Sequence, residues 1–209
     1  MFLAHFAVGL VTSRLAPRLP LGTAFVAAQL PDAIWPYLLL TGIERVTIAP
    51  GENPITPLHF DHYPWSHSLL MVVVWGIVFV AGYGLLFRAS KAAFLLLPLA
   101  VSHWLLDAAS HLPDVPVWPG GPLVGLGLWQ SRTLTLLVEG GLFAGAVAFY
   151  ARGRRVGIGF WSLVGFLVVI YATSVFGPPP PSVAAIGWSM IPVVPALWWW
   201  GNRVAREKS

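Results

Sequence analysis

The stretch FLLLPLAVSHWLLDAASH, residues 94–111, combines a long apolar run with three ionisable side chains. Its length approaches the roughly 20 mainly apolar residues that a helix needs to cross a bilayer core. His103, Asp107 and His111 recur every four residues, so on an α-helix they drift by only about 40° per step and share one stripe. An ionisable residue at the bilayer centre costs about 2.5–3.5 kcal/mol on insertion scales. The stretch therefore predicts a membrane helix with a functional polar stripe.

Composition extends this prediction to the whole chain. Of its 209 residues, 57% are hydrophobic and only 10% are charged, whereas soluble domains carry about 25% charged residues. The eleven tryptophans suit the membrane–water interfaces. The absence of cysteine excludes disulfides and thiolate metal ligands. The sequence predicts an all-α, polytopic membrane helix bundle that forms one integral membrane domain, residues 1–209.

Apolar runs place about six transmembrane helices in this bundle. The opening stretch 1–13 is too short to cross alone, so we expect a re-entrant helix or one packed inside the bundle. It lacks the basic segment and cleavage site of a signal peptide, and we expect the mature protein to keep it. Gly141 and Gly145 form a GxxxG pattern, which indicates a packing face inside the monomer, the alternative we favour, or a dimer contact. The predicted spans are residues 21–43, 66–87, 92–112, 131–151, 157–176 and 183–201.

Basic residues give the bundle an orientation. If the spans alternate in direction, every basic cluster falls on one side, and by the positive-inside rule that side is the cytoplasm, together with the C-terminus. The long connections 44–65 and 113–130 then lie outside. The net charge of +4 reflects these short clusters and does not indicate nucleic-acid binding. The clusters are Arg14 with Arg18, Arg88 with Lys91, Arg152 with Arg154 and Arg155, and Arg203 with Arg206 and Lys208.

The polar stripe on residues 94–111 has the composition of a metal site. Imidazole nitrogens and carboxylate oxygens are ligands suited to zinc, manganese or iron. His103 and Asp107 are the closest pair in depth and are expected to chelate one ion. His111, one turn further out, is expected to serve a second ion or to act as a base. The alternative is a polar stripe that faces an aqueous cavity or bonds to neighbouring helices, but three such groups in lipid favour metal or proton chemistry.

The stretch HFDHYPWSHSLL, residues 59–70, adds further imidazoles. His62 and His67 would not converge on a continuous helix, but Pro64 predicts that a helix begins between them. A loop His62 and a first-turn His67 are then expected to approach one centre at the outer mouth of the bundle. The alternative is a polar loop with incidental histidines, which we favour for His59.

Other acidic and imidazole groups lie inside or near the predicted spans. Asp32 falls halfway along the first span, where a carboxylate must be protonated or paired, and it is a candidate bridging ligand, general base or proton carrier. His5, in the opening stretch, is a further candidate ligand. Glu139 is a candidate general base, an acceptor for the second N–H of a ligating imidazole, or a buried protonated acid.

The order of these motifs resembles the YdjM-like family of inner-membrane proteins, described as LexA-binding, metal-dependent hydrolases. The match covers residues 1–120 or so, and one departure is Tyr63-Pro64, where the family commonly has a basic residue and a glycine. This departure makes His67 the firmer ligand of the two. The resemblance implies a metal-dependent hydrolase in the bacterial inner membrane, with a cytoplasmic regulatory protein as a partner. The matching residues are His5, Leu30-Pro31-Asp32, His62, Ser66-His67-Ser68-Leu69, His103 and Asp107.

The leading hypothesis from sequence is a membrane-embedded hydrolase that holds one or two divalent ions, zinc first among them. Its substrate would be amphipathic, a lipid-like ester or phosphoester that approaches from the bilayer on the outer side. Two alternatives belong to other classes. Buried Asp, Glu and His chains also serve as proton relays in transporters, and a non-enzymatic scaffold could hold a structural metal.

Overall fold

Long apolar runs fold into the longest helices of the structure. The computed structural model describes residues 1–87 and 91–206, so Arg88 and Lys208 of the predicted topology lie outside the described residues. Helices dominate the chain, which confirms the predicted all-α fold class. In chain order the elements are α1 (Leu3–Leu15), α2 (Leu21–Ala28), α3 (Leu30–Leu40), β1 (Arg45–Ile48), β2 (Leu58–His62), α4 (Pro64–His67), α5 (Leu69–Phe87), η1 (Lys91–Leu95), α6 (Leu96–Ser110), β3 (Val115–Pro116), β4 (Leu123–Val124), η2 (Leu128–Gln130), α7 (Arg132–Ala151), α8 (Ile158–Phe176), α9 (Val183–Met190) and α10 (Val193–Arg206).

Within the described residues, five helical stretches are long and apolar enough to cross a membrane. Each matches a predicted span to within a few residues at its start. Most of their side chains are not buried inside the bundle, as expected where lipid takes the place of water. Length and composition are thus those of a membrane protein. The stretches are Leu69–Phe87, Ala92–Ser110, Arg132–Ala151, Ile158–Phe176 and Val183–Ala205.

The structure corrects the prediction of one continuous helix over residues 21–43. This stretch forms two helices, α2 and α3, which meet at Gln29. Pro31 explains the interruption, because it has no N–H to donate to the carbonyl four residues earlier and its ring clashes there. The break falls beside Asp32, so it also positions a predicted site residue.

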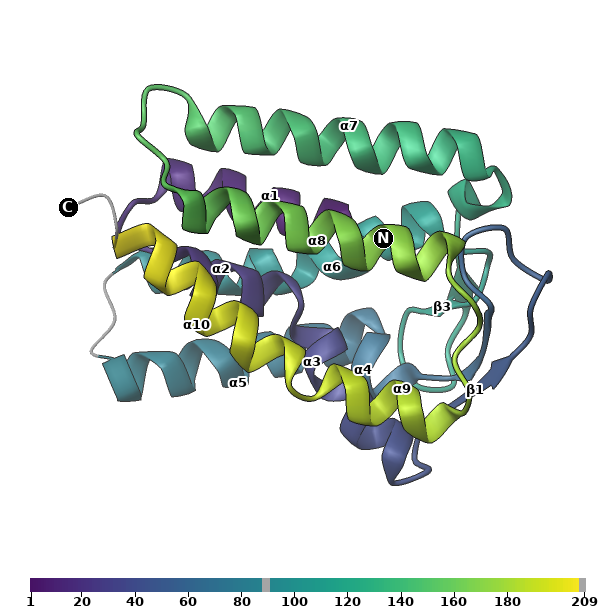
Figure 1. The fold of residues 1–209 in the computed structure, drawn as a ribbon. Helices are drawn as coiled ribbons and strands as arrows, with labels where there is room; N and C mark the ends of the chain where they lie inside the picture. Colours follow the sequence, from purple (N-terminus) through teal and green to yellow (C-terminus); the bar gives the residue numbers. More distant parts are fainter. Residues whose placement is uncertain (88–90, 207–209) are drawn as a thin grey trace.

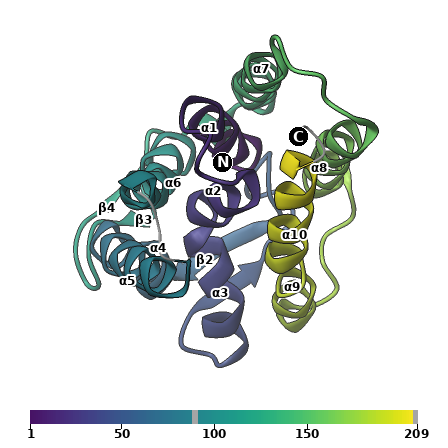
Figure 2. The same cartoon turned by 90° about the vertical axis from the view of Figure 1, so that its left-hand side faces the viewer.

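The opening helix α1 packs inside the bundle, as one of the two alternatives predicted. Its side chains Leu3, Phe6 and Leu10 are almost fully buried, and Figure 2 shows α1 and α2 at the centre with the other long helices around them. Helix α2 packs closely against α10 as well as against α1. A β-carbon at Gly22 would collide with the Trp198 carbonyl, so a glycine is needed where the two helices cross.

The two ends of the bundle differ in chemistry. The α1–α2 and α7–α8 connections lie at the same end as the C-terminal end of α10 (Figure 1), so the described basic clusters gather there as predicted. The opposite end carries two short antiparallel pairs, β1–β2 and β3–β4. In the first pair Arg45 faces His62 and Ile48 faces Leu58. The strands lie in the two long connections, for which the sequence predicted no regular structure.

The GxxxG pattern does not pack within the monomer, which overturns the favoured alternative. Gly141 and Gly145 are exposed, and a β-carbon on either would meet nothing within 4 Å. The buried face of α7 is instead formed by Phe143, Val147 and Tyr150, which join the core around α1 and α8. The dimer contact stays a prediction.

Candidate metal centre

His103 lies at the middle of the site because the α2–α3 break holds its ring. The His103 Nδ1 donates to the carbonyl of Ala28, the last residue of α2, at 2.8 Å. A carbonyl only accepts, so Nδ1 carries a proton and Nε2 is the nitrogen left for a ligand. The ring is fully buried, and its Nε2 has no hydrogen bond of acceptable angle from the described residues.

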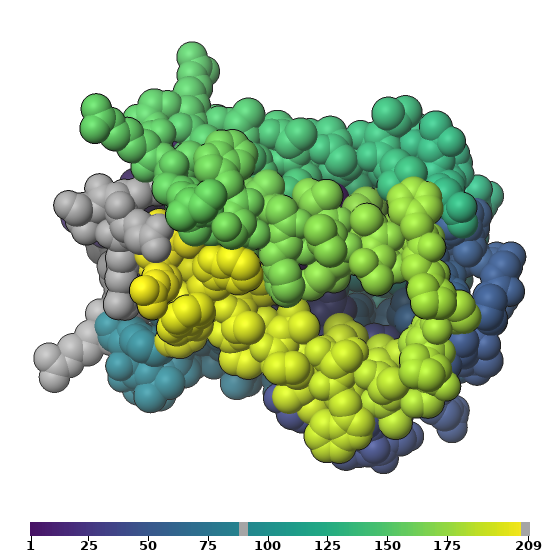
Figure 3. Space-filling model, viewed as in Figure 1, coloured from purple at the N-terminus to yellow at the C-terminus, as the bar shows by residue number. Residues whose placement is uncertain are grey.

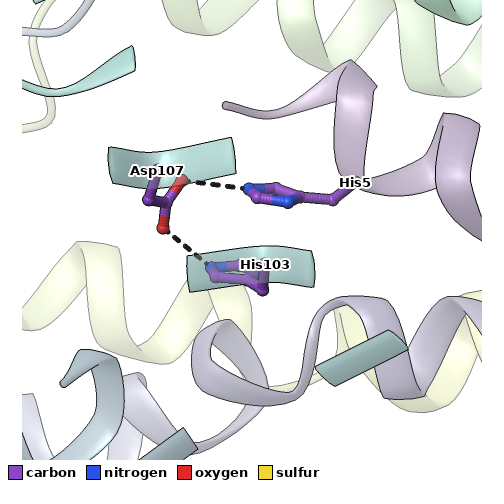
Figure 4. A group of neighbouring side chains, drawn as sticks. All are labelled: His5, His103 and Asp107. Carbon is purple, nitrogen blue, oxygen red and sulfur yellow. Dashed lines mark hydrogen bonds and ion pairs between the residues drawn. The ribbon is translucent and has the colours of Figure 1, made fainter. Parts of the chain in front are cut away.

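Carboxylates from two helices approach this nitrogen. The His103 Nε2 lies 3.0 Å from Asp107 Oδ2 on the same helix and 4.0 Å from Asp32 Oδ2 on α3. Asp107 also reaches α1, since its Oδ1 lies 3.2 Å from His5 Nε2 (Figure 4). The rings of His5 and His103 are stacked at 3.8 Å between centroids. His103 and Asp107, the predicted pair, therefore lie next to the predicted ligands His5 and Asp32.

These residues form two overlapping groups that could hold a metal ion. The first is His5, His103 and Asp107, and the second is Asp32, His67 and His103, with the donor atoms of each group within 4.8 Å of one another. Donors around a tetrahedral zinc with bonds of about 2 Å lie about 3.3 Å apart. The His–Asp pairs, at 3.0–4.0 Å, are close to this spacing. Asp107 Oδ1 also lies 2.6 Å from the Met1 ammonium, which an ion bound there would have to displace.

His67 is oriented by a chain of hydrogen bonds that sequence reasoning missed. The Ser66 hydroxyl donates to Glu44 Oε2 at 2.6 Å and lies 2.6 Å from His67 Nδ1. Having given its single proton to Glu44, Ser66 can only accept from His67 Nδ1–H. The His67 Nε2 is then the free nitrogen, and it lies 3.3 Å from Asp32 Oδ1. Glu44 therefore fixes the tautomer of a candidate ligand from outside the cluster.

Glu44 is also the acceptor at the start of α4. Its Oε1 accepts from the backbone N–H groups of Trp65 and Ser66 at 2.7 and 2.8 Å. In the sequence Glu44 falls at the start of the predicted outer connection 44–65, and no role was predicted for it. One signal was available: a helix that begins at Pro64 has unpaired N–H groups in its first turn and needs an acceptor.

Replacement of Glu44 by alanine is expected to weaken metal binding about 10–100-fold, the usual effect of removing the partner of a ligating histidine. Metal affinity is measured by competition with a chromogenic chelator. Glu52→Ala is the matched control, because Glu52 is an exposed carboxylate that bonds only the surface residue His59 in the same loop. Equal affinities in the two variants would contradict the role given to Glu44.

His111 lies at the edge of the cluster and belongs to neither group of three. Its Nε2 is 4.0 Å from Asp107 Oδ1, and its Nδ1 is 3.1 Å from Asp114 Oδ1. Tyr63 donates its hydroxyl to the same Asp114 oxygen at 3.1 Å. Burial, followed by the carboxylates of Asp114 and Asp107, raises the pKa of Tyr63 well above its ordinary value. The phenol therefore stays protonated and remains a donor beside His111.

Glu139 bonds to the backbone at the start of α1, and not to a ligating imidazole as one alternative predicted. It is fully buried, and its Oε2 accepts from the backbone N–H groups of Phe2 and Leu3 at 2.8 and 2.9 Å. These are unpaired donors at the start of α1, so the carboxylate also complements the positive end of the helix dipole. No described imidazole bonds to it. Because α1 carries His5, Glu139 acts on the site by holding that helix in place.

The remaining loop histidines stay outside the cluster. His62 is exposed at the end of β2 and lines a separate cavity near Asp114. β2 ends at this residue, where it pairs with Arg45. Convergence of His62 and His67 on one centre is thus not seen, whereas His59 is a surface residue paired with Glu52, as expected.

A cavity of about 160 Å³ adjoins the candidate ligands. Besides the His and Asp residues it is lined by Trp35, Trp129 and Glu139. The indole N–H groups of both tryptophans are buried without a partner among the described residues. Buried donors are nearly always paired in folded proteins, so these two indicate a place for an oxygen-bearing ligand.

Comparison of the chain with protein-family models, curated proteins and solved structures found no match. The class of protein follows from its own fold and site. Within the described residues it is a membrane-type helical bundle with a buried group of histidines and aspartates that could hold a metal ion.

Proposed function

We propose that the protein is a membrane-embedded, metal-dependent hydrolase of an amphipathic, lipid-like ester or phosphoester. One observation carries the proposal: two groups of His and Asp donors share the free Nε2 of His103 beside a cavity. We expect zinc, because imidazole and carboxylate ligands in a tetrahedral arrangement suit it. The ligands would be His5, Asp32, His67, His103 and Asp107, and a second ion would need a bridging carboxylate, since His103 has only one free nitrogen.

The cavity favours a catalytic metal over a structural one. Structural zinc sites are closed by four protein ligands, whereas catalytic sites keep a position open for water or substrate. When bound, the ion would polarise the scissile bond and lower the pKa of water at the site towards about 7. A scaffold with a purely structural metal would have no use for an open cavity beside its ligands.

Asp32 is the residue we assign as general base. Its side chain is 30% exposed, whereas that of Asp107 is 6% exposed and engaged by two histidines. Asp32 can therefore meet both water and substrate and take up a proton at its free oxygen.

The location of the site supports a lipid-like substrate on the extracytoplasmic side. The site lies in the half of the bundle that carries the strand pairs, opposite the basic connections (Figure 1), and the positive-inside rule assigns the basic end to the cytoplasm. The proposal also includes membership of the YdjM-like family, a location in the bacterial inner membrane and a cytoplasmic regulatory partner.

The arrangement does not favour a proton-coupled transporter. A relay needs polar groups strung from one face to the other. The buried ionisable residues of the described chain instead gather in and around the metal centre. Between them and the basic end lies an apolar cluster of Leu19, Ala24, Leu96 and Leu99.

The proposal is tested by elemental analysis of detergent-purified protein prepared without added metal, followed by a hydrolysis screen with fluorogenic phospholipid and acyl-ester substrates. We expect at least one transition-metal ion per chain, and activity that a chelator removes and zinc restores. Failure to bind any metal, even after reconstitution with zinc, would overturn the proposal. Metal without hydrolysis of any lipid-like ester would leave only a metal-binding scaffold.

A further inference from the structure

A second cavity, of about 330 Å³, opens between α8 and α9–α10. Figure 3 shows this face hollowed between the two helical segments, with the 177–182 connection closing it at the strand end. Its walls are apolar on three sides. They include Phe25 and Val26 from α2, Ile170 from α8, and Met190, Val193 and Leu197 from α9–α10.

This cavity adjoins the one at the metal centre. Phe2 and Asp32 line both cavities. Asp32 lies 3.3 Å from His67, so the inner end of the apolar cavity reaches a candidate ligand. A molecule that filled both would have an apolar part between the helices and a polar part at the ligands.

The inner end carries a polar group in need of a partner. Gln29, at the α2–α3 break, is 6% exposed and lines the apolar cavity. Its Oε1 has no hydrogen-bond partner among the described residues. A buried amide oxygen without a partner is costly, so the α2–α3 break leaves an unsatisfied polar group in the wall of the apolar cavity.

The mouth of the cavity faces the bilayer. Both bounding segments are among the stretches long and apolar enough to cross a membrane. Large apolar side chains point outward on either side of it, among them Val169 and Phe176 on α8 and Trp188 on α9. In a membrane the medium at this opening is hydrocarbon, so its natural occupant is a lipid chain.

We propose that the cavity is the entry groove and binding site for one hydrocarbon chain of a bilayer lipid, whose polar end meets the metal centre. That this lipid is the substrate rests on the proposed function. The volume lies at the lower end of the about 300–1,000 Å³ typical of ligand pockets, which suits one chain segment and leaves any second chain in the bilayer.

The groove gives the lipid chain a path to the site and adds little to its binding free energy. Its walls are no more apolar than the lipid outside, so a chain gains little by moving between them. It does, however, let the chain stay in apolar surroundings while the head group reaches Asp32. A substrate that had to leave the membrane for a water-filled site would lose that solvation. Selectivity among lipids would then depend on contacts of the head group with Gln29 and the candidate ligands.

Photolabelling tests the groove without requiring metal or hydrolysis. The protein is reconstituted in phosphatidylcholine bilayers that contain phosphatidylglycerol with a diazirine on one acyl chain, and labelled peptides are mapped by mass spectrometry. Helix α2 is the reporter, because Phe25 is 2% exposed and lines the groove. Helix α5 is the internal control, because Leu85 and Leu86 face outward and contact lipid in any case.

We expect labelling of both helices in the wild type and loss of the α2 label in Ile170→Trp, which fills the groove. Val169→Trp is the matched control, since Val169, next to Ile170 in the chain, is 62% exposed and does not line the groove, so its replacement should leave the label in place. Val194→Phe, from the opposite wall, should repeat the loss, and a wild-type melting temperature together with an unchanged α5 label shows that each variant has folded.

An α2 peptide that stays unlabelled in the wild type while α5 is labelled would overturn the groove. Labelling that persists in both filled variants would overturn it as well. Labelling that follows the expected pattern in a protein that binds no metal would support the groove and refute the hydrolase, so the two proposals fail separately.

Discussion

Replacement of His103 by asparagine is expected to abolish metal binding while the bundle still assembles. The asparagine amide can keep the hydrogen bond to the Ala28 carbonyl, but it cannot supply the imidazole Nε2 shared by both ligand groups. Even an outer partner of a ligand affects metal affinity about 10–100-fold, so loss of this central ligand should cost at least about 100-fold. The measurement is metal content after purification, with a chelator titration of the zinc-reconstituted protein.

Two further variants make this result specific. His62→Ala should bind metal like the wild type, because His62 is exposed on β2 and lies outside the cluster. His103→Ala should lose both metal and stability, since it removes the ligand and also leaves the Ala28 carbonyl unpaired. Wild-type metal content in His103→Asn would show that the ion, if any, is held elsewhere.

The second large effect is expected from Asp32→Asn, which should lower the hydrolysis rate about 10²–10⁴-fold, the usual contribution of a general base. Asparagine keeps the shape of the side chain and one oxygen, so metal content should fall far less than in His103→Asn. The decisive measurement is the pH dependence of the rate in the zinc-loaded protein. Loss of the base should lower the rate per bound zinc ion across the whole profile, whereas loss of a ligand would lower the zinc content.

Asp107→Asn separates this role from simple ligation. Asp107 is buried between His5 and His103 and does not line the apolar groove. Its replacement should therefore act mainly through metal loss, and excess zinc should partly restore the rate. If Asp32→Asn were rescued by zinc in the same way, Asp32 would be a ligand only and the assignment of the base would fail.

The sequence predicts those parts of the fold and site that depend on local spacing. Apolar runs give the five long stretches, and the four-residue interval in SHWLLDAASH places His103 and Asp107 on one face of α6. Ionisable groups in or near apolar runs mark His5, Asp32 and His67 as candidates, and the structure groups each of them with His103. Each of these inferences needs only helix geometry and the cost of a charge in lipid.

The features that the sequence did not predict depend mainly on the tertiary contacts of the long connections. Glu44 is near in sequence to Arg45 and Glu52, which are surface residues, and only the return of the chain at α4 brings it to Ser66. His62 lies in the same returning connection, in the strand β2, and is exposed there. The interruption of the first predicted span had a local signal in Pro31, but prolines also occur in continuous membrane helices, so hydropathy concealed it.

The break between α2 and α3 has a consequence for the order in which the site is assembled. An interrupted helix leaves carbonyls unpaired, which is costly in a lipid environment. The Ala28 carbonyl is satisfied by the same imidazole that lies between the two donor groups. The ring is thus locked in its binding orientation when the helices dock, and its rotational entropy is lost during folding and not when an ion arrives. An arriving ion would meet a donor that is already in position.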